Sequence, residues 1–199
     1  MYKLADKLYS YEAWAMESDR LRLSVLRPGK AGDTSAYFRK NRKFHAKWSQ
    51  THSDSYFTKA TQKEYMKYDL KEFKRGYLFP LWITSKDEPG KLLGRVSYFN
   101  FAYGGMMSCS VGYHLDQDAC GHGYMEEAIK ASCSLLKDVL HLHRIEAFIL
   151  PENEKSLSTI QRCGFHHEGI RYSYMHINGK WRDHMSFYLL DEDIKTLVN

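Results

Sequence analysis

Alternating hydrophobic and polar side chains predict the β-strands of this chain. Residues 20–27 read Arg-Leu-Arg-Leu-Ser-Val-Leu-Arg, which has the two-residue period of a half-buried strand. Three further segments, residues 77–84, 92–101 and 106–115, are rich in aromatic and branched side chains and predict strands of the same kind. Lys-Asp-Glu-Pro-Gly over residues 86–90 indicates a hairpin connection between the first two of these three.

Three other segments have the longer spacing of helices. Residues 33–48, with Asp33 or Thr34 as N-cap, and residues 60–75 are polar and bear aromatic side chains, and we expect a helix in each. Residues 123–140 place small or apolar side chains at helical spacing, which predicts a long helix with one face in the core.

The last third of the chain mixes both patterns. Residues 144–150 alternate again and predict a strand, so a strand precedes and follows the long helix. This order is typical of a β-α-β unit with a parallel strand pair. The remaining predicted elements are a short helix over residues 154–162 and a hairpin of strands over residues 172–177 and 181–190, joined by Asn178-Gly179. Residues 1–199 are therefore expected to form a single α+β domain.

Length and composition fit one globular domain. The chain has 199 residues, 43% of them hydrophobic, which is enough to form a core. It has no apolar run of the roughly 18 residues that a membrane span needs, and its first residues lack an apolar signal core, so we expect a cytoplasmic protein without membrane contact. The cysteines have no paired spacing, which predicts reduced thiols without a disulfide frame or zinc site. They are Cys109, Cys120, Cys133 and Cys163.

Positive charge is concentrated in the first half of the chain. Residues 1–100 contain 20 Lys and Arg against 11 Asp and Glu, whereas residues 101–199 contain 9 against 13. Five cations on the first predicted helix lie among aromatic residues and could contact RNA or a ribosome. The alternative, which we favour, is a solvated helix face. The five cations are Arg39, Lys40, Arg42, Lys43 and Lys47.

A segment with two glycines, between the strand 106–115 and the helix 123–140, carries candidate chemistry. Gly121 and Gly123 allow a tight turn, and the helix start offers unpaired N–H groups to negative charge. The segment is a candidate phosphate-binding turn. Glu126 stands where the dinucleotide fingerprint needs a third glycine, and no Gly-Lys-Ser/Thr follows, which excludes a nucleotide P-loop.

Several motifs between residues 93 and 190 resemble one enzyme family. Gly121-His-Gly-Tyr-Met-Glu-Glu-Ala128 is similar to the acyl-CoA pyrophosphate loop of the GCN5-related N-acetyltransferase (GNAT) superfamily. The later motifs resemble its ribosomal-protein-alanine N-acetyltransferase branch. They are His143-Arg-Ile-Glu-Ala147, Pro151-Glu-Asn-Glu-Lys-Ser156, Cys163-Gly-Phe165 with Glu168-Gly169, and Ile177-Asn-Gly-Lys-Trp-Arg-Asp-His184.

This resemblance implies an α/β/α sandwich whose mixed seven-stranded sheet splays between its fourth and fifth strands, here residues 106–115 and 144–150. Acetyl-CoA, the co-substrate, would lie in the opening, and no metal is implied. The backbone at Leu115 would pair with the pantetheine arm, Asn153 would fix the cofactor near its thioester, and Ser156 would approach the sulfur. Main-chain amides of the turn would hold the pyrophosphate, namely those of Cys120, Gly121, His122, Gly123 and Tyr124.

The implied reaction is attack of a neutral amine on a thioester. It needs a free amine lone pair, N–H donors that face the developing oxygen charge, and a proton for the departing sulfur. An α-amino group has a pKa of about 7.7 to 8.0, so about a tenth of it is neutral at pH 7, whereas a lysine, at about 10.4, is neutral in only a few parts in ten thousand. A protein N-terminus therefore demands less of a general base.

Two side chains are candidates for the proton transfers. His114 would lie near the thioester and could accept the amine proton, the alternative being a packed strand histidine. Ser156 could donate to the leaving thiolate, the alternative being a serine that caps its helix. Many superfamily members carry a tyrosine acid at the position of Ile160, and that version of the acid is excluded here. His122 stands where relatives often have Lys or Arg.

We expect an acetyl-CoA-dependent N-acetyltransferase that works by direct attack in a ternary complex. The expected acceptor is a protein N-terminus, such as that of a ribosomal protein, and the helices over residues 33–75 would form the acceptor side. One alternative is acetylation of a small amine, such as a polyamine, amino sugar or antibiotic. Another is a non-catalytic ribosome-binding or RNA-binding protein with this fold. Either a monomer or a homodimer is compatible with the sequence.

Overall fold

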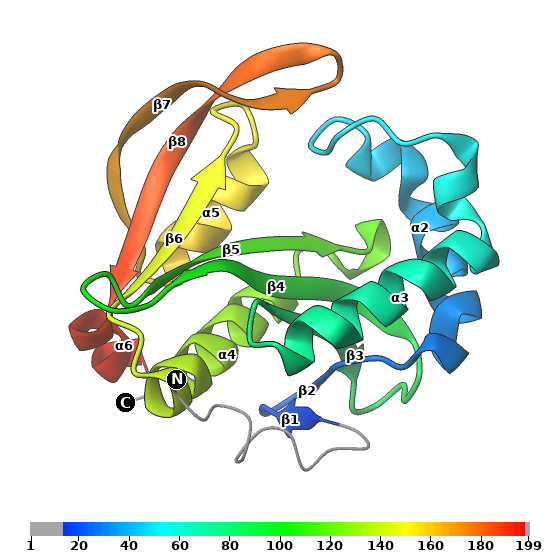
Figure 1. The fold of residues 1–199 in the computed structure, drawn as a ribbon, viewed down its shortest axis with the longest axis horizontal. Coiled ribbons are helices and arrows are strands. Elements are labelled where there is room, and N and C mark those ends of the chain that lie inside the picture. The colour runs from blue at the N-terminus through cyan, green and yellow to red at the C-terminus, as the bar shows by residue number, and fades with distance from the viewer. Residues whose placement is uncertain (1–13, 198–199) are drawn as a thin grey trace.

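The computed structural model describes residues 14–197, and its strands form one eight-stranded sheet in the order β1-β2-β3-β4-β5-β6-β8-β7 (Figure 1). The strands are β1 (Ala15–Glu17), β2 (Leu21–Ser24), β3 (Leu78–Ser85), β4 (Leu92–Ala102), β5 (Ser108–Leu115), β6 (Arg144–Ile149), β7 (His166–Ile177) and β8 (Lys180–Leu190). The helices are α2 (Ala31–His45), α3 (Lys59–Lys74), α4 (Tyr124–Leu140), α5 (Glu154–Arg162) and α6 (Asp191–Leu197). Short 3-10 turns lie at Pro28–Lys30, Asp54–Phe57 and Gln117–Ala119.

The expected mixed α+β sheet is confirmed, although it has eight strands within residues 14–197 instead of seven. Sequence periodicity predicted neither β1 nor α6. A strand of three residues is too short to display an alternation, so β1 left no signal. The predicted parallel pair is β5 with β6, and the predicted terminal hairpin is β7 with β8.

The sheet opens between β5 and β6. These two strands pair only where Ser108–Val111 lies beside Arg144–Ala147. Beyond that point β5 continues to Leu115 along β4, whereas β6 continues to Ile149 along β8. The carboxyl ends of the two central strands therefore diverge, and Figure 1 shows the β7–β8 hairpin extending away from the rest of the sheet. This is the splay that the family resemblance implied.

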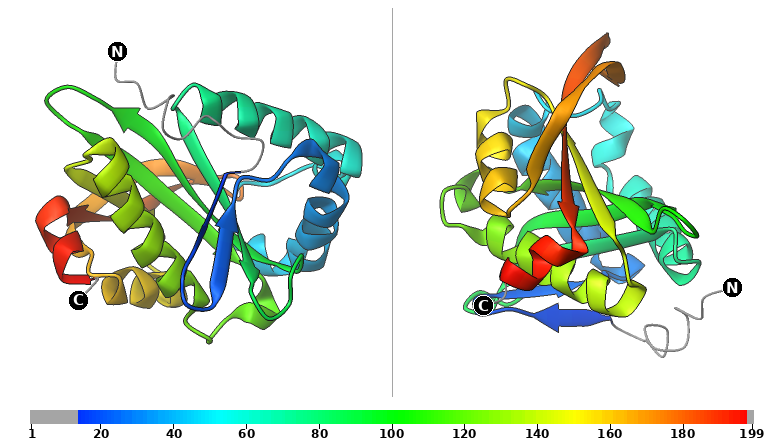
Figure 2. Two further views of the ribbon diagram at one scale, coloured as in Figure 1. Left: turned by 90° about the horizontal axis from the view of Figure 1, so that it is seen from below. Right: turned by 90° about the vertical axis from the view of Figure 1, so that its left-hand side faces the viewer.

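Helices cover the central sheet on two faces (Figure 2). Alternation along β4 directs Val96 and Tyr98 toward α4, whereas Arg95 forms an ion pair with Asp69 of α3, N–O distance 3.0 Å. Two clusters of buried side chains result. The larger one lies against α4, and the smaller one joins α2 to β3 through Tyr37, Phe38 and Trp82.

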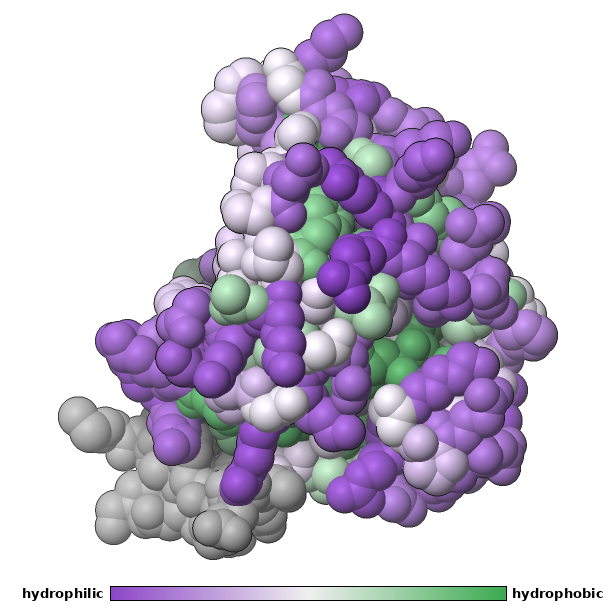
Figure 3. Space-filling view, turned by 90° about the vertical axis from the view of Figure 1, so that its right-hand side faces the viewer, coloured by the Kyte–Doolittle hydropathy of each residue, from purple (hydrophilic) through white to green (hydrophobic). Residues whose placement is uncertain are grey.

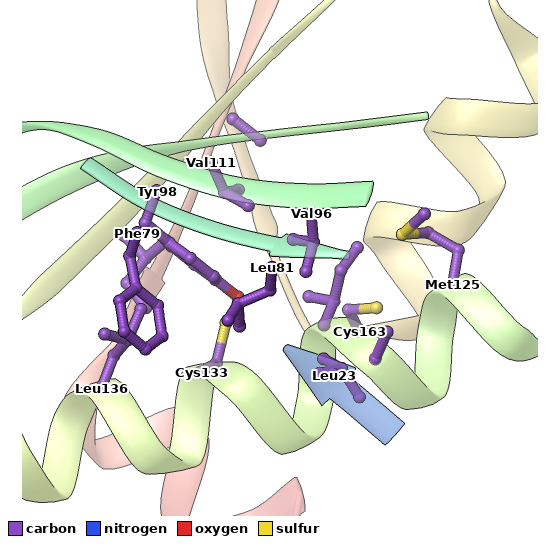
Figure 4. Packing of buried hydrophobic residues seen from close by; sticks show 14 of the residues in the cluster. Leu23, Phe79, Leu81, Val96, Tyr98, Val111, Met125, Cys133, Leu136 and Cys163 are labelled. Carbon is purple, nitrogen blue, oxygen red and sulfur yellow. The ribbon is translucent and has the colours of Figure 1, made fainter. Parts of the chain in front are cut away.

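The larger cluster fixes the position of α4, the helix that begins at the glycine turn. Cys133 and Leu136 point from α4 toward Leu81 and Phe79 of the strands, and Met125 belongs to the same cluster at the other end of α4 (Figure 4). Each fully buried aliphatic side chain of this kind contributes about 1.5 to 3 kcal/mol to folding. The amino-terminal end of α4 is therefore held firmly beside the point where the sheet opens.

The first helix begins earlier than the predicted cap residues. Its N-cap is Lys30, which ends the 3-10 turn, so Asp33 and Thr34 lie inside the first helical turn and the predicted caps are wrong. Thr34 instead donates from Oγ1 to the Ala31 carbonyl, 3.2 Å. The physical reason is Pro28, whose fixed φ favours a helical turn immediately after the strand.

All four cysteines of the chain lie within the described residues 14–197. All four cysteines are free. Within residues 14–197 no group of His, Cys, Asp and Glu is arranged to hold a metal ion. No helix of the described region is long and apolar enough to span a bilayer.

Candidate active site

The turn between β5 and α4 has the backbone shape that only glycine adopts easily. Gly121 has φ +86° and Gly123 has φ +75°, both in the left-handed region. A Cβ on Gly121 would meet no atom within 4 Å, so the backbone conformation, and not crowding, requires glycine there. Gly123 is the N-cap of α4 and supplies no side-chain partner to its first N–H groups. Those groups form the positive end of the helix.

The glutamates of this first turn are both neutralised by cations. Glu127 accepts from Arg20 Nε at 2.7 Å and from Ser18 Oγ at 2.7 Å. Burial alone would raise the pKa of Glu127, but the hydrogen bonds from Arg20 and Ser18 hold it below its ordinary value. Glu126 forms ion pairs with Lys130 and Arg162, both at 2.8 Å. The helix start therefore presents its N–H groups without an opposing free carboxylate.

A cavity of about 860 Å³ lies beside this turn and the diverging end of β5. The end of α2 and the segment 46–57 form one side of it, and the start of α5 forms another. Every predicted site residue except His122 lines it: His114, Leu115, Cys120, Gly121, Gly123, Tyr124, Asn153 and Ser156. His122 is exposed, and its carbonyl accepts from Arg20 Nη1 at 2.9 Å.

Asn153 and Ser156 have distinct places at the start of α5. Asn153 is the N-cap, and its Oδ1 accepts from the Ser156 N–H at 3.3 Å. Ser156 therefore does not cap the helix. Its Oγ donates to Tyr113 Oη at 2.8 Å, and Tyr113 donates to the Ser156 carbonyl at 3.1 Å. The sequence analysis missed Tyr113, because nothing in the local pattern shows which strand residue faces α5.

His114 lies on the opposite face of β5 from Tyr113, among the aromatic rings of the α2 side. Its Nδ1 is 2.8 Å from Tyr37 Oη, and its ring centroid is 5.1 Å from that of His45. Burial is the main reason that the pKa of the His114 imidazole lies well below its ordinary value, and the nearby His45 and Arg95 lower it further. The imidazole is therefore neutral at pH 7. If Nδ1 carries the proton and donates to Tyr37, the lone pair of Nε2 is free.

His45 is a second cavity residue that sequence reasoning missed. Its Nε2 donates to the Leu115 carbonyl at 2.8 Å, and burial lowers its pKa. That carbonyl belongs to the backbone expected to pair with pantetheine. The Leu115 carbonyl at the end of β5 is therefore already hydrogen-bonded to His45.

The helix α2 is tied to the end of β5 by Asn41 and Lys40. Asn41 Nδ2 donates to Asp116 Oδ2 at 3.1 Å, and Asn41 Oδ1 accepts from the Gln117 N–H at 2.9 Å. Lys40 Nζ lies 2.8 Å from carboxylate oxygens of both Asp116 and Asp118. These contacts place the end of α2 over the cavity.

Of the five clustered cations on α2 and in the turn after it, two are engaged in ion pairs. Lys40 binds the two aspartates, and Arg42 lies 2.6 Å from Asp54 and stacks over the Phe57 ring. Arg39, Lys43 and Lys47 are exposed. The cluster presents less free charge than the sequence indicated.

Comparisons with known proteins agree with this geometry. Residues 20–166 match the model described as "Acetyltransferase (GNAT) domain". The chain is 34% identical over 155 residues to the probable N-acetyltransferase YjcK of Bacillus subtilis, covering 77% of this chain and 84% of that protein. It is 28% identical over 178 residues to the [ribosomal protein uS5]-alanine N-acetyltransferase of Escherichia coli, covering 89% and 91%. The solved ribosomal-protein-S5-alanine acetyltransferase of Vibrio fischeri superposes with a TM-score of 0.84 at 29% identity, over 90% of this chain and 98% of that one.

Proposed function

Because the chain belongs to the GNAT acetyltransferase family, we propose that it transfers the acetyl group of acetyl-CoA to the N-terminal α-amino group of a protein. The observation that carries the proposal is the cavity where β5 and β6 diverge, with the amino-terminal end of α4 on one side and Ser156 on another. The similarity to ribosomal-protein-alanine acetyltransferases favours a ribosomal protein as the acceptor.

The residues around the cavity fit acetyl-CoA. The uncapped N–H groups of α4 and the left-handed glycines of the turn suit a diphosphate, and Glu126 and Glu127 are already neutralised. The amides of residues 120–124 would hold the pyrophosphate. The Leu115 carbonyl would pair with the pantetheine arm once His45 releases it, and Asn153 would lie near the thioester.

The chain's own residues supply the two proton-handling groups. His114 Nε2 accepts the amine proton, directly or through water, because the neutral imidazole keeps a lone pair at pH 7. As the C–N bond forms and the C–S bond breaks, the electron pair passes to the sulfur. Ser156 Oγ donates a hydrogen bond to that sulfur. Acetyl-CoA supplies the activated acetyl group, and the thiolate takes up a proton from solvent.

The acceptor side of the cavity is aromatic and nearly free of carboxylates. Phe44, Trp48 and Tyr56 line it, and among the described residues the whole cavity has two carboxylates, Glu126, which is in ion pairs, and Glu154. A polyamine carries several positive charges and needs several carboxylates around it. A short uncharged N-terminal residue such as alanine or serine fits this lining better than a polyamine does.

An acceptor screen tests the proposal. We expect acetyl-CoA to be consumed with short peptides that begin with Ala or Ser, and mass spectrometry to locate the acetyl group on the α-nitrogen. The matched control is the same peptide with a formylated N-terminus and an internal lysine, which should be inert. If the peptides are inert while spermidine or an amino sugar is acetylated, the protein-acceptor assignment is wrong.

A further inference from the structure

The hydroxyl groups of Tyr113 and Ser156 form a closed pair at the cavity wall. Ser156 Oγ donates to Tyr113 Oη at 2.8 Å, and the phenol donates in turn to the Ser156 carbonyl at 3.1 Å. The two residues come from different elements, β5 and α5, which flank the opening of the sheet. Both line the cavity.

In this pair, strand β5 brings the phenol of Tyr113 to the start of α5. The helix position one turn after Ser156 is Ile160, which is fully buried in the larger core cluster and has no polar group. No phenol can therefore come from that position of α5. Tyr113 brings one from the facing strand instead.

We propose that Tyr113 is a positioning residue for acetyl transfer, and that its hydroxyl, by donating to the Ser156 carbonyl, holds the first turn of α5 where the Ser156 side chain can reach the departing sulfur. The proposal rests on the role of Ser156 proposed above. The phenol of Tyr113 stays protonated because burial raises its pKa, and its O–H is directed at the Ser156 carbonyl. When Ser156 turns its O–H to the sulfur, Tyr113 keeps its bond to the Ser156 carbonyl and holds the first turn of α5 in place.

A double-mutant cycle tests this role. Tyr113→Phe keeps the ring and removes only the hydroxyl, so we expect kcat to fall about fivefold, as for loss of one neutral hydrogen bond, with KM for acetyl-CoA unchanged. In a Ser156→Ala background the same change should alter kcat by less than about twofold, because its target is already gone. Tyr98→Phe is the matched control, since its hydroxyl bonds Ser132 in the core away from the cavity, and it should leave kcat unchanged.

Each outcome separates the two claims. If Ser156→Ala has wild-type activity, the proposed place of Ser156 at the sulfur fails. If Ser156→Ala is impaired but Tyr113→Phe is not, only the positioning role of Tyr113 is overturned. If Tyr113→Phe lowers kcat equally in both backgrounds, or if Tyr98→Phe lowers it as much, the hydroxyl acts on general stability and the inference is wrong.

The outer face of α3 carries five exposed lysines. Five lysines lie on an arc about 120° wide, because they are spaced mostly four residues apart on a helix that turns about 100° per residue. All five are exposed: Lys59, Lys63, Lys67, Lys71 and Lys74. Lys67 pairs with Glu64, at 2.8 Å, and the other four have no hydrogen-bond or ion-pair partner among the described residues.

One exposed tyrosine, Tyr68, borders these lysines, and it is 58% exposed. Tyr65 lies on the opposite side of the helix, where its ring packs against that of Tyr56 with 5.4 Å between centroids. The acidic residues Asp69 and Glu72 are buried and paired with Arg95 and Arg75, so they do not cancel the lysine charge on the outer face. The side of the molecule that carries α2 and α3 is mostly hydrophilic (Figure 3).

We infer that this α3 surface, defined by the five lysines with Tyr68, binds single-stranded RNA. Unpaired lysines contact phosphates without regard to sequence, and an exposed aromatic ring stacks on an unpaired base. An acidic protein would use the lysines but would have no base to stack on Tyr68. This surface replaces the α2 cluster as the candidate RNA contact, since two of the α2 cations are already engaged.

Binding of an unstructured RNA oligonucleotide, measured by fluorescence anisotropy at several salt concentrations, tests this inference. Affinity for wild type should fall steeply with salt, and Lys63→Glu/Lys67→Glu/Lys71→Glu should weaken it more than about tenfold. The matched control Arg39→Glu/Lys43→Glu/Lys47→Glu, on α2 and in the turn after it, should weaken it less than about threefold. Both variants should still acetylate a short peptide.

Several results of these experiments would contradict RNA binding by the α3 surface. Equal losses in both charge variants would show attraction by net charge alone. Binding of poly-glutamate as tight as that of the RNA, or no effect of Tyr68→Ala on RNA affinity, would assign the surface to an acidic protein. Any of these results overturns the inference of an RNA-binding surface.

Discussion

At the scale of single residues, the site depends on side chains kept in one protonation state or one backbone conformation. His114 is neutral because it is surrounded by Tyr37, Phe38 and other rings and lies near His45 and Arg95. Tyr37 is buried, which raises the pKa of its phenol and keeps that phenol uncharged beside His114 Nδ1. A neutral imidazole that donates from Nδ1 to Tyr37 keeps a lone pair on Nε2 as a proton acceptor in the neutral pH range.

The depressed pKa of His114 predicts how stability depends on pH. The unfolded chain takes up a proton at this group below about pH 6.5, whereas the folded chain does not, so the contribution is complete above that pH and is lost as pH falls toward the folded pKa. His114→Gln removes this titration. We expect the free energy of unfolding to drop between pH 7 and pH 5 by about 1 kcal/mol more in wild type than in the variant, measured by urea denaturation. Equal drops would contradict the burial of a neutral His114.

Substitution of Gly123 by a negatively charged residue should weaken cofactor binding by more than backbone strain alone would. Gly123→Glu places a carboxylate at the proposed pyrophosphate site, and we expect KM for acetyl-CoA to rise more than about tenfold. Gly104 is the matched control, because it has the same φ of +75° in the β4–β5 turn and open space around it. Gly104→Glu should cost similar stability and leave KM unchanged. A similar rise of KM in both variants would remove the turn at residues 120–124 from cofactor binding.

At the scale of elements, the contact between α2 and the end of β5 organises the cavity. Asn41 is fully buried and joins Asp116 and Gln117 to α2. Burial by itself raises the pKa of Asp116, but hydrogen bonds from Lys40 and Asn41 bring it below its ordinary value. The helix and the strand end therefore form one unit on the proposed acceptor side of the cavity.

Asn41→Ala tests that unit. The change leaves the buried Asp116 carboxylate and the Gln117 N–H each short of a partner, so we expect the free energy of unfolding to fall by about 2 kcal/mol and KM for the peptide to rise. Gln161→Ala, on the exposed face of α5, should change stability by less than about 0.5 kcal/mol. Urea denaturation measures both. A fall for Asn41→Ala as small as that for Gln161→Ala would show that the contact does not hold α2.

Periodicity predicted the elements whose core face is long and continuous. The predicted helix over residues 123–140 is α4 (Tyr124–Leu140), and that over residues 154–162 is α5 (Glu154–Arg162). β1 was missed because three residues show no period, and the start of α2 was misplaced because Pro28 begins a turn that favours an earlier helix. Capping residues in the sequence predict where a helix starts only when no neighbouring turn begins the helix earlier.

The motifs placed the main groups of the candidate site along the chain but not their partners. Gly121, Gly123 and Ser156 were singled out because glycine turns and family motifs are local in sequence. Tyr113 and His45 were not, because each gains its meaning from a contact 43 or 70 residues away. Such contacts depend on how the strands pair and on which face each side chain takes.

At the scale of the whole molecule, the opening between β5 and β6 connects the fold with the proposed acetyl transfer. β5 stays with β4, and β6 stays with β8, so the sheet behaves as two halves joined over four residue pairs. The α4 start, the α5 start and the end of α2 meet where these halves diverge. The proposed cofactor and acceptor sites both depend on that divergence.

The most direct test of this account is a crystal structure of the protein with coenzyme A. We expect the pyrophosphate within hydrogen-bond distance of the main-chain N–H groups of residues 120–124, the pantetheine arm between β5 and β6, and the thiol near Ser156. The Leu115 carbonyl should then bind the pantetheine arm in place of His45. A structure with β5 and β6 fully paired, or with coenzyme A bound away from this turn, would contradict it.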